Sequence, residues 1–366
     1  EYYFNDHGEQ INRFAKSLVA AWAEANNLGE AGYQTETPCD GYKGAYINEI
    51  AARVQAEAES DGVDLTALAH QDQGLNDDGE PLGEADTEVR EEFRKRAVPM
   101  MFDEIQKSMK DFRVNFDVWF HENSLYADGK VDAAIEELKS RGDIFDKDGA
   151  TWFESTKHGD DKDRVIIKSN GEFAYFAADI AYHRNKFAVR GFDRVINIWG
   201  ADHHGHVARL KGALDAIGLD GDKLDIVLMQ LVKLLRDGEV VRMSKRTGKA
   251  ISLSDLLDEV SVDAARWYFN AKPDTQMEFD LGLAVREDSE NPIYYVEYAH
   301  ARICSLLRTL GEENVSVPAQ ADVDMSLLTG EAERALLKQI AQFSEVIKLA
   351  ARDYDPSYIN RYLQEL

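Results

Sequence analysis

Short apolar segments suited to β-strands alternate with helical segments between residues 114 and 231, and this alternation constrains the fold more than any other feature. Strands that alternate with helices are usually joined by right-handed crossovers into a parallel sheet. The middle of the chain therefore predicts an α/β fold. The predicted strands are 114–120, 151–153, 165–168, 195–199 and 226–231, and the predicted helices are 131–141, 176–187 and 207–217.

The regions on either side of this alternation are predicted to be helical. Residues 6–26 and 88–109 repeat apolar side chains at helical spacing, with Pro99 expected to interrupt or kink the second helix. After Ser254 the pattern predicts helices only. Apolar residues step by three or four along 293–310 and 328–347, which predicts two amphipathic helices that pack as a bundle.

The charge of the chain excludes some classes of partner. Lys and Arg number 42 against 68 Asp and Glu, a net charge of −26, which argues against a general nucleic-acid coat or an anionic membrane surface. A local basic patch remains compatible with this balance. Residues 57–92 hold thirteen acidic residues and one basic residue, Arg90, and we interpret them as a solvated, partly flexible insertion rather than an acidic recognition element.

The cysteine content indicates a reducing compartment, and the apolar runs are too short to cross a membrane. Cys39 and Cys304 are too few for a disulfide framework or a cysteine zinc site. The longest apolar stretch, residues 226–235, is half the length of about 20 residues that crosses a bilayer. We expect a cytoplasmic protein with no membrane partner.

One segment is locally basic in this acidic chain. Residues 242–249 contain Arg242, Lys245, Arg246 and Lys249, with Ser, Thr and Gly between them. A loop of this kind can wrap a polyphosphate and neutralise charge that develops on phosphoryl oxygens. An ordinary basic surface turn is the alternative.

A second segment places polar residues after a predicted strand. The apolar run 195–199 leads into Gly200, Asp202 and His203 just before a helix, and ligands of open α/β sheets bind at this end of a strand. Asp202 could accept hydrogen bonds from ribose hydroxyls. A zinc site with His203, His204 and His206 is the disfavoured alternative, because consecutive residues leaving a strand point in different directions.

A third segment pairs a phenol with a carboxylate. Tyr175 and Asp179 lie one helical turn apart on one face, among apolar neighbours. A half-buried carboxylate requires a cation, supplied by an internal salt bridge or by a ligand. From spacing alone, the internal salt bridge is the safer interpretation.

Together these segments resemble arginyl-tRNA synthetase, a class I aminoacyl-tRNA synthetase. The loop 242–246 is similar to the signature Lys-Met-Ser-Lys-Ser, matching at Met243, Ser244 and Lys245 and departing at Arg242 and Arg246. Further similar segments are residues 2–11, 200–203, 262–266 and 291–302. The resemblance runs nearly end to end and is weakest in the acidic segment.

The resemblance implies a class I synthetase fold: a Rossmann-like parallel sheet with an incomplete first half, followed by an all-α anticodon-binding bundle. The implied segments are 1–34 (end of the first half of the catalytic domain), 35–110 (acidic helical insertion), 111–253 (second half of the catalytic domain), 254–285 (helical connector) and 286–366 (part of the anticodon-binding domain).

The resemblance also assigns roles to residues. Glu122, Tyr175 and Asp179 match positions that hold the substrate guanidinium, a planar group with five donors that suits carboxylates and a phenolic oxygen. Some relatives carry a glutamine where Ala201 stands. No resident metal is expected. The implied catalytic residues are Lys245, Ser244 and Arg242, and the implied ATP-binding residues are Gly200, Asp202, His203, Val241, Met243 and Lys245.

The implied reaction is the adenylation of L-arginine by ATP with Mg²⁺, then transfer to the 3′ end of tRNA(Arg). We expect a monomer without a tightly bound cofactor, whose amino-acid activation depends on tRNA. The alternatives are a class I synthetase for another amino acid, or a non-catalytic synthetase-like protein that binds tRNA. A third, an unrelated nucleotidyltransferase, does not explain the helical C-terminal part.

The first class I signature, His-x-Gly-His, is expected before Tyr2 and is not in the chain, whose first residue is Glu1 rather than Met. The string 203–206 fits that pattern but lies in the second half of the expected sheet, so we interpret it as coincidental. The helical domain also ends earlier than the family would imply.

We therefore expect residues 1–366 alone to show little or no aminoacylation, and the complete protein to be active. Arginylation assays of both test this, and full activity of the 366-residue chain would contradict it.

Overall fold

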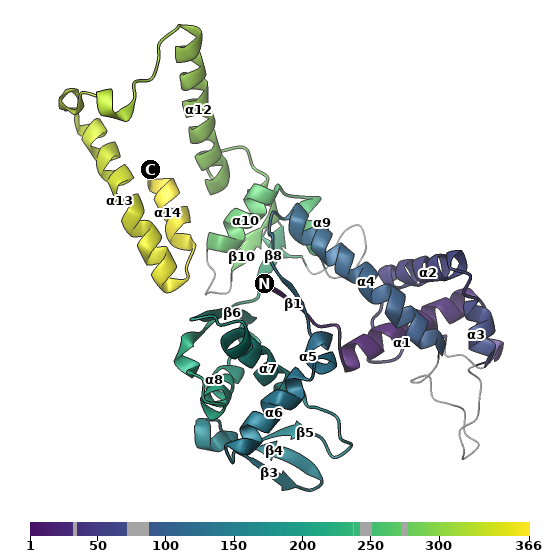
Figure 1. Ribbon diagram of the computed structural model, residues 1–366. Helices are drawn as coiled ribbons and strands as arrows, with labels where there is room; N and C mark the ends of the chain where they lie inside the picture. Colours follow the sequence, from purple (N-terminus) through teal and green to yellow (C-terminus); the bar gives the residue numbers. More distant parts are fainter. Residues whose placement is uncertain (32–34, 72–87, 237, 242–250, 272–276) are drawn as a thin grey trace. The chain divides into compact units, whose positions relative to one another are not determined.

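A parallel pair of strands opens the chain in the computed structural model, which describes residues 1–31, 35–71, 88–236, 238–241, 251–271 and 277–366 (Figure 1). β1 (Tyr2–Phe4) pairs with β2 (Trp119–His121) across more than a hundred residues, with Tyr3 opposite Phe120. The predicted strand 114–120 is wrong in its start, because only its last two residues belong to β2. The contacts divide the chain into two units, residues 1–193 with 209–221 and residues 194–208 with 222–366.

Four helices between these two strands share one core. They are α1 (Glu9–Ala25), α2 (Ala45–Ser60), α3 (Leu65–Gln71) and α4 (Glu88–Asp111), with a 3₁₀ turn at Leu28–Ala31. Leu18 and Trp22 of α1 meet Val54 of α2 and Phe93 of α4 in that core, because apolar residues spaced by four share a helix face. Figure 1 shows these helices as one group.

The described parts of the acidic segment, residues 57–71 and 88–92, are largely helical and contribute to this core. Ala58 and Leu65 are buried in the core of this helical group. Arg96, itself buried, binds Asp61 at 2.6 Å and Glu92 at 3.1 Å, so part of the acidic charge is paired. Residues 72–87 lie outside the described part. α4 runs through Pro99 as one helix, so the predicted interruption is wrong, and the alternative of a kink stays a prediction.

The rest of the first unit combines helices with a small antiparallel sheet. Its helices are α5 (Asn123–Ala127), α6 (Lys130–Ser140), α7 (Tyr175–Arg184) and most of α8 (His206–Ala216), with a 3₁₀ turn at Ser155–His158 and a π-helical turn at Asn185–Val189. The sheet holds β3 (Ile144–Lys147), β4 (Ala150–Phe153) and β5 (Arg164–Ile167). It is antiparallel throughout, so the predicted parallel pairing is wrong here.

A buried carboxylate holds α8 against the segment after β4. Asp160 accepts hydrogen bonds from Ser155 Oγ at 3.0 Å, Arg164 Nε at 2.8 Å and Arg209 Nε at 3.1 Å. Burial alone would raise the pKa of Asp160, but the hydrogen bonds from Arg164 and its other donors outweigh burial and hold that pKa well below its usual range.

The second unit contains the parallel pair that the sequence predicts. β6 (Val195–Gly200) pairs in parallel with β7 (Leu224–Met229), with Val195 opposite Leu224. A second sheet places β8 (Lys233–Arg236) between β9 (Glu239–Val240) and β10 (Glu278–Asp280). β10 lies in the region predicted to be helical only, so that prediction is wrong at these three residues.

The remaining helices of this unit are α9 (Leu253–Leu257), α10 (Val262–Ala271), α11 (Leu281–Ala284), α12 (Pro292–Glu312), α13 (Glu331–Asp353) and α14 (Ser357–Glu365), with short 3₁₀ turns at Ala201–His203, Gly221–Lys223, Gln320–Asp322 and Met325–Leu327. α12 and α13 confirm the two predicted amphipathic helices. Their apolar stripes do not bury each other within the described chain, since Ile303, Leu306, Ile340 and Phe343 are all exposed.

A helix that crosses a bilayer must be about 20 residues long and mostly apolar. No helix among the described residues is both long enough and apolar enough for this.

Two helical glycines provide a test of the packing of α8. A Cβ on Gly212 would lie 2.2 Å from the carbonyl oxygen of His158, whereas a Cβ on Gly311 of α12 would meet nothing within 4 Å. Gly212→Ala should therefore lower the free energy of unfolding by about 1–3 kcal/mol. The control Gly311→Ala should raise it by about 0.5–1 kcal/mol, because alanine loses less backbone entropy in a helix. Urea unfolding measures both, and equal effects would contradict the close approach.

Candidate active site

A cavity of about 560 Å³ opens in the first unit where the start of α1, α4, α5 and the start of α7 come together. Glu122 and Tyr175, two of the residues predicted to bind substrate, both line it. The other lining residues are His7, Gly8, Glu9, Asn12, Arg94, Tyr126, Lys168, Glu172 and Phe173.

The pairing of β1 with β2 places Glu122 at the edge of this cavity. The Glu122 N–H donates to the carbonyl oxygen of Phe4 at 3.0 Å, directly after β2 ends. Asp6 then binds the first turn of α5, since its carboxylate accepts from the Asn123 N–H at 2.9 Å and contacts His121 Nδ1 at 2.6 Å. Two chain segments far apart in sequence therefore fix the backbone at Glu122.

Neutral polar groups surround the Glu122 side chain, which is 3% exposed. The nearby hydroxyl groups of Tyr3 and Tyr126 lower the pKa of its carboxyl group. The hydrogen-bonding surroundings of Asn5 orient its amide so that Nδ2 donates to Glu122 Oε2 at 2.7 Å and to the His7 carbonyl at 3.1 Å. The described residues form no salt bridge with Glu122 at 4.0 Å or less.

Burial disfavours the ionised form of the Glu122 carboxyl group. Desolvation is the largest cause and the negative charge of Asp179 the next, and together they raise the pKa of Glu122 to about 7. The Tyr3 and Tyr126 hydroxyls oppose this by favouring the ionised form. Burial and the same two carboxylates also raise the pKa of Tyr3 and of Tyr126, so both remain protonated at neutral pH.

Tyr175 and Asp179 lie at adjacent turns of α7, as their spacing predicts. The Tyr175 side chain is 57% exposed and reaches the cavity. Asp179 does not line it, but lies near enough for its charge to act on Glu122, Tyr3 and Tyr126. The structure thus brings the three predicted binding residues together.

The basic residues that line the cavity have carboxylate partners of their own. Arg94 contacts Glu91 at 2.8 Å, one turn away on α4, and Lys168 contacts Glu172 at 2.9 Å. Neither forms a salt bridge with Glu122 in the described chain. The cavity therefore combines a buried carboxylate, a second nearby carboxylate and a phenol, with free volume beside them. This arrangement favours a cationic ligand with several N–H donors.

The predicted nucleotide loop lies in the second unit and is described by itself. Gly200 ends β6, and a Cβ there would lie 2.5 Å from Asp202 Oδ1, so a larger residue would require the exposed Asp202 side chain to move. Asp202 and His203 are exposed on the 3₁₀ turn, with 3.7 Å between a carboxylate oxygen and Nε2. Among the described residues, no three His, Cys, Asp or Glu side chains gather as metal ligands.

The basic loop lies largely outside the described residues. This applies to Arg242, Met243, Ser244 and Lys245. Val241 is described, and its N–H donates to the Leu234 carbonyl at 2.8 Å. Only its carbonyl side is therefore available for the predicted backbone contact with adenine.

Sequence reasoning missed Tyr3, Asn5 and Tyr126 as members of the site. Two periodicities could have indicated them. Tyr3 lies on β1 and Asn5 follows directly after it, two residues apart as side chains on one face of an extended chain are. Glu122 and Tyr126 are four residues apart at the start of a helix, as Tyr175 and Asp179 are. The first pair required knowledge that β1 lies beside β2.

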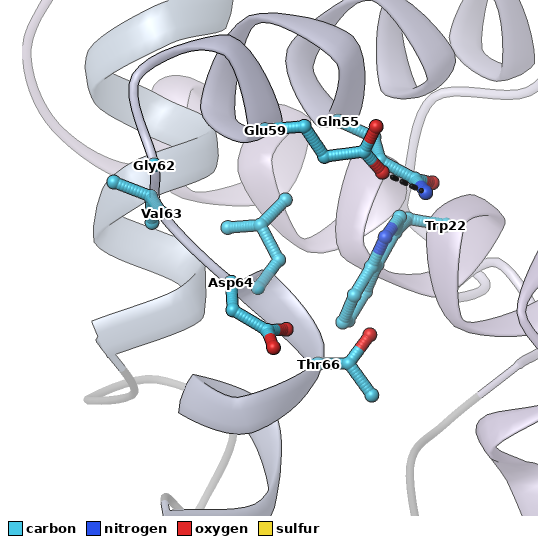
Figure 2. A pocket seen from close by; sticks show the side chains of 8 residues that line it. Trp22, Gln55, Glu59, Gly62, Val63, Asp64 and Thr66 are labelled. Carbon is cyan, nitrogen blue, oxygen red and sulfur yellow. Dashed lines mark hydrogen bonds between the residues drawn. The ribbon is translucent and has the colours of Figure 1, made fainter.

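The helical group contains a second cavity, of about 400 Å³, beside Trp22 (Figure 2). Gln55 and Glu59 of α2 border it, joined by a hydrogen bond of 2.9 Å, and Asp64 and Thr66 lie opposite. The indole N–H of Trp22 is buried and has no hydrogen-bond partner in the described chain. An ordered water molecule would satisfy this donor.

Comparison with protein-family models gives two matches. The model described as tRNA synthetases class I (R), catalytic domain, matches residues 81–287. The model described as DALR anticodon binding domain matches residues 296–366. Together they cover the α/β part and the C-terminal helices.

Curated proteins similar to the chain are arginine–tRNA ligases. The chain is 69% identical over its whole length to the protein of that name from Bifidobacterium longum (strain NCC 2705), and covers 59% of it. It is 46% identical to the arginine–tRNA ligase of Acetivibrio thermocellus, covering 61% of that protein. The chain thus spans about three-fifths of the length of these relatives.

Solved structures similar to the chain include synthetases of the same kind. A putative arginyl-tRNA synthetase from Campylobacter jejuni matches with a TM-score of 0.79 and 31% identity, over 99% of this chain and 73% of that one. Thermus thermophilus arginyl-tRNA synthetase matches with a TM-score of 0.67 and 18% identity, over 100% and 65%, which shows the fold alone.

The raised pKa of Glu122 predicts a gain in stability when its charge is removed. The folded state binds a proton between pH 4.5 and about 7 that the unfolded state has released, so stability from this residue is full below pH 4.5 and lost as pH rises through 7. Glu122→Gln should therefore be more stable than the wild type at pH 8.5, by an amount on the order of 1–3 kcal/mol.

Urea unfolding of both proteins at pH 5.5 and 8.5 measures this difference. The advantage of Glu122→Gln should shrink at pH 5.5, where the wild-type carboxyl group is already protonated. A variant less stable than the wild type at pH 8.5 would mean that the protein itself satisfies the Glu122 charge.

Proposed function

The chain belongs to the family of class I (R) tRNA synthetases, and from this premise we propose that the protein is an arginine–tRNA ligase. In this proposal it activates L-arginine with ATP and transfers the arginyl group to the 3′ end of tRNA(Arg). The observation that carries the proposal is the cavity beside Glu122, where carboxylates gather and the lining cations are paired elsewhere.

Recognition of arginine rests on charge and on donor number. The guanidinium group carries a permanent positive charge and five N–H donors in a plane. In our proposal Glu122 and Asp179 supply the negative charge and Tyr175 a phenolic oxygen. A neutral analogue would leave buried negative charge without a partner, which is the most effective basis for rejecting it.

The proposed chemistry has two steps. A carboxylate oxygen of arginine attacks the α-phosphorus of ATP, so that a carboxyl–phosphate bond forms and the bond to pyrophosphate breaks. A hydroxyl of the terminal ribose of tRNA(Arg) then attacks the arginyl carbonyl, and AMP leaves. In-line displacement at phosphorus depends mainly on positioning and on neutralising charge.

Residues of the second unit supply the nucleotide contacts in this proposal. Gly200, Asp202 and His203 hold the nucleoside at the carboxyl end of β6, with Val241 and Met243 beside the adenine. Lys245, with Ser244 and Arg242, stabilises the phosphates as the bond to pyrophosphate breaks. ATP enters as its Mg²⁺ complex, in which the ion offsets part of the phosphate charge.

The C-terminal helices are the proposed tRNA-binding part. Residues 296–366 match an anticodon-binding domain, and we propose that they contact tRNA(Arg) through a restricted basic strip, given the net charge of −26. The proposed protein works as a monomer in the cytoplasm, and the segment boundaries expected from the sequence are part of the proposal.

Pyrophosphate exchange into ATP, measured on the complete protein with tRNA present, tests the function. Arginine should support exchange, while lysine, glutamate, cysteine and the neutral isostere citrulline should be at least about 10⁴-fold poorer substrates in kcat/KM. Exchange with another amino acid would indicate another specificity. tRNA binding without any exchange would indicate a non-catalytic protein.

Two substitutions separate the proposed roles in the same assay. Asp179→Asn should raise the KM for arginine by about 100-fold, because it leaves a buried positive charge underpaired. Lys245→Ala should lower kcat by about 100-fold with the arginine KM nearly unchanged, while the control Lys249→Ala from the same basic segment should have a much smaller effect. Equal losses of kcat in both lysine variants would mean that the loop contributes only its general positive charge, and that Lys245 has no specific role.

A further inference from the structure

A polar contact joins the C-terminal helices to the β6–β7 pair within the second unit. Asp225, the second residue of β7, accepts a hydrogen bond from the Tyr354 hydroxyl at 2.8 Å. Arg194, directly before β6, donates to the same carboxylate oxygen at 2.7 Å and to the Tyr354 hydroxyl oxygen at 3.4 Å. Three side chains from segments up to 160 residues apart therefore form one closed set of hydrogen bonds.

Tyr354 occupies a backbone position that tyrosine does not favour. It ends α13 with φ 52° and ψ 34°, in the left-handed region where glycine or asparagine is the usual residue. The helix end itself uses only the Tyr354 N–H, which donates to the Ala350 carbonyl. We therefore look to the side chain, and its contact with Asp225, for the reason that a bulky residue stands here.

A second contact attaches the next helix. Asn360 of α14 donates from Nδ2 to the Trp267 carbonyl oxygen of α10 at 2.9 Å. Ser357 and Tyr362 of the same helix are buried. The two C-terminal helices are thus attached at two points, α13 to the strand pair through Tyr354 and α14 to α10 through Asn360.

The contact at Asp225 lies at the opposite end of β6 from the proposed nucleotide site. Arg194 precedes this strand, whereas Gly200 ends it and leads into the turn 201–203. A strand of six residues spans about 20 Å, so side chains at its start do not reach a nucleotide at its end. An effect of this contact on the reaction must therefore act through the placement of the C-terminal helices.

We propose that Asp225 and Tyr354 are positioning residues for tRNA: their hydrogen bond fixes the C-terminal helices on the β6–β7 pair before tRNA binds, and Arg194 holds the carboxylate in place. This inference rests on the proposed function, because it takes those helices as the tRNA-binding part. When the helices are less firmly attached, only the attached fraction of the protein is ready to bind tRNA, and the apparent affinity falls by that fraction. The rate of the complex, once formed, is unchanged.

Arginylation by the complete protein, measured over a range of tRNA(Arg) concentrations, tests this role. Tyr354→Phe keeps the ring and removes the donor, and Asp225→Ala removes the acceptor that both partners share. Each should raise the KM for tRNA(Arg) by about threefold to tenfold, with kcat at saturating tRNA and the KM for arginine nearly unchanged. Adding Asn360→Ala to Tyr354→Phe removes both attachments and should raise the tRNA KM further.

Two comparisons separate positioning from a general loss of stability. Tyr358→Phe removes another hydroxyl from the same helices, whose hydrogen bond goes to Asp353 at 2.9 Å, and should leave the tRNA KM unchanged. Tyr354→Phe in an Asp225→Ala background should cause no further rise, because the two residues share one hydrogen bond. A protein that simply folds poorly would instead lose kcat while keeping its KM for tRNA.

The outcomes distinguish this inference from the proposed function. If the wild-type protein does not arginylate tRNA(Arg), the proposed function fails and the inference fails with it. If the wild type is active, and Tyr354→Phe and Asp225→Ala keep its tRNA KM or lose kcat alone, the positioning role is wrong and the proposed function stands.

Discussion

The site depends on one electrostatic constraint: carboxylates removed from water need a positive partner or must stay protonated. Glu122 is buried, lies near the like charge of Asp179, and forms no salt bridge among the described residues, while the neutral Asn5 amide donates to it. The described chain pairs the cations that line the same cavity with other carboxylates. The described residues thus leave the buried Glu122 carboxyl group without a positive partner in the empty cavity, which is why we propose a cationic substrate there.

The fold around this site fixes the position of the buried Glu122 side chain. β1 pairs with β2 so that the Phe4 carbonyl binds the Glu122 amide, and Asp6 binds the first turn of α5. The helical group between the two strands contributes α4 and with it Arg94 at the cavity wall. The buried carboxyl group therefore lowers the stability of the folded protein at a pH where it is ionised.

The errors of the sequence predictions have identifiable causes. The segment 144–153 forms a hairpin because Asp148 and Gly149 both adopt positive φ, at 52° and 75°, which suits a two-residue turn. The rule that alternating strands and helices make a parallel sheet overlooked this Asp-Gly signal. β10 has only three residues and pairs with a strand more than forty residues earlier, so no local pattern identified it.

The sequence by itself determined the helices, the β6–β7 pair with its terminal Gly200, and the one-turn spacing of Tyr175 and Asp179, because these depend on periodicities within a few residues. The spacing alone favoured an internal salt bridge for Asp179. Only the tertiary structure decided that Asn5, just after β1, donates to Glu122 more than a hundred residues away, and that the cavity's cations are paired elsewhere. The physical reason is that burial and charge pairing depend on neighbours in space, which the order of residues along the chain does not specify.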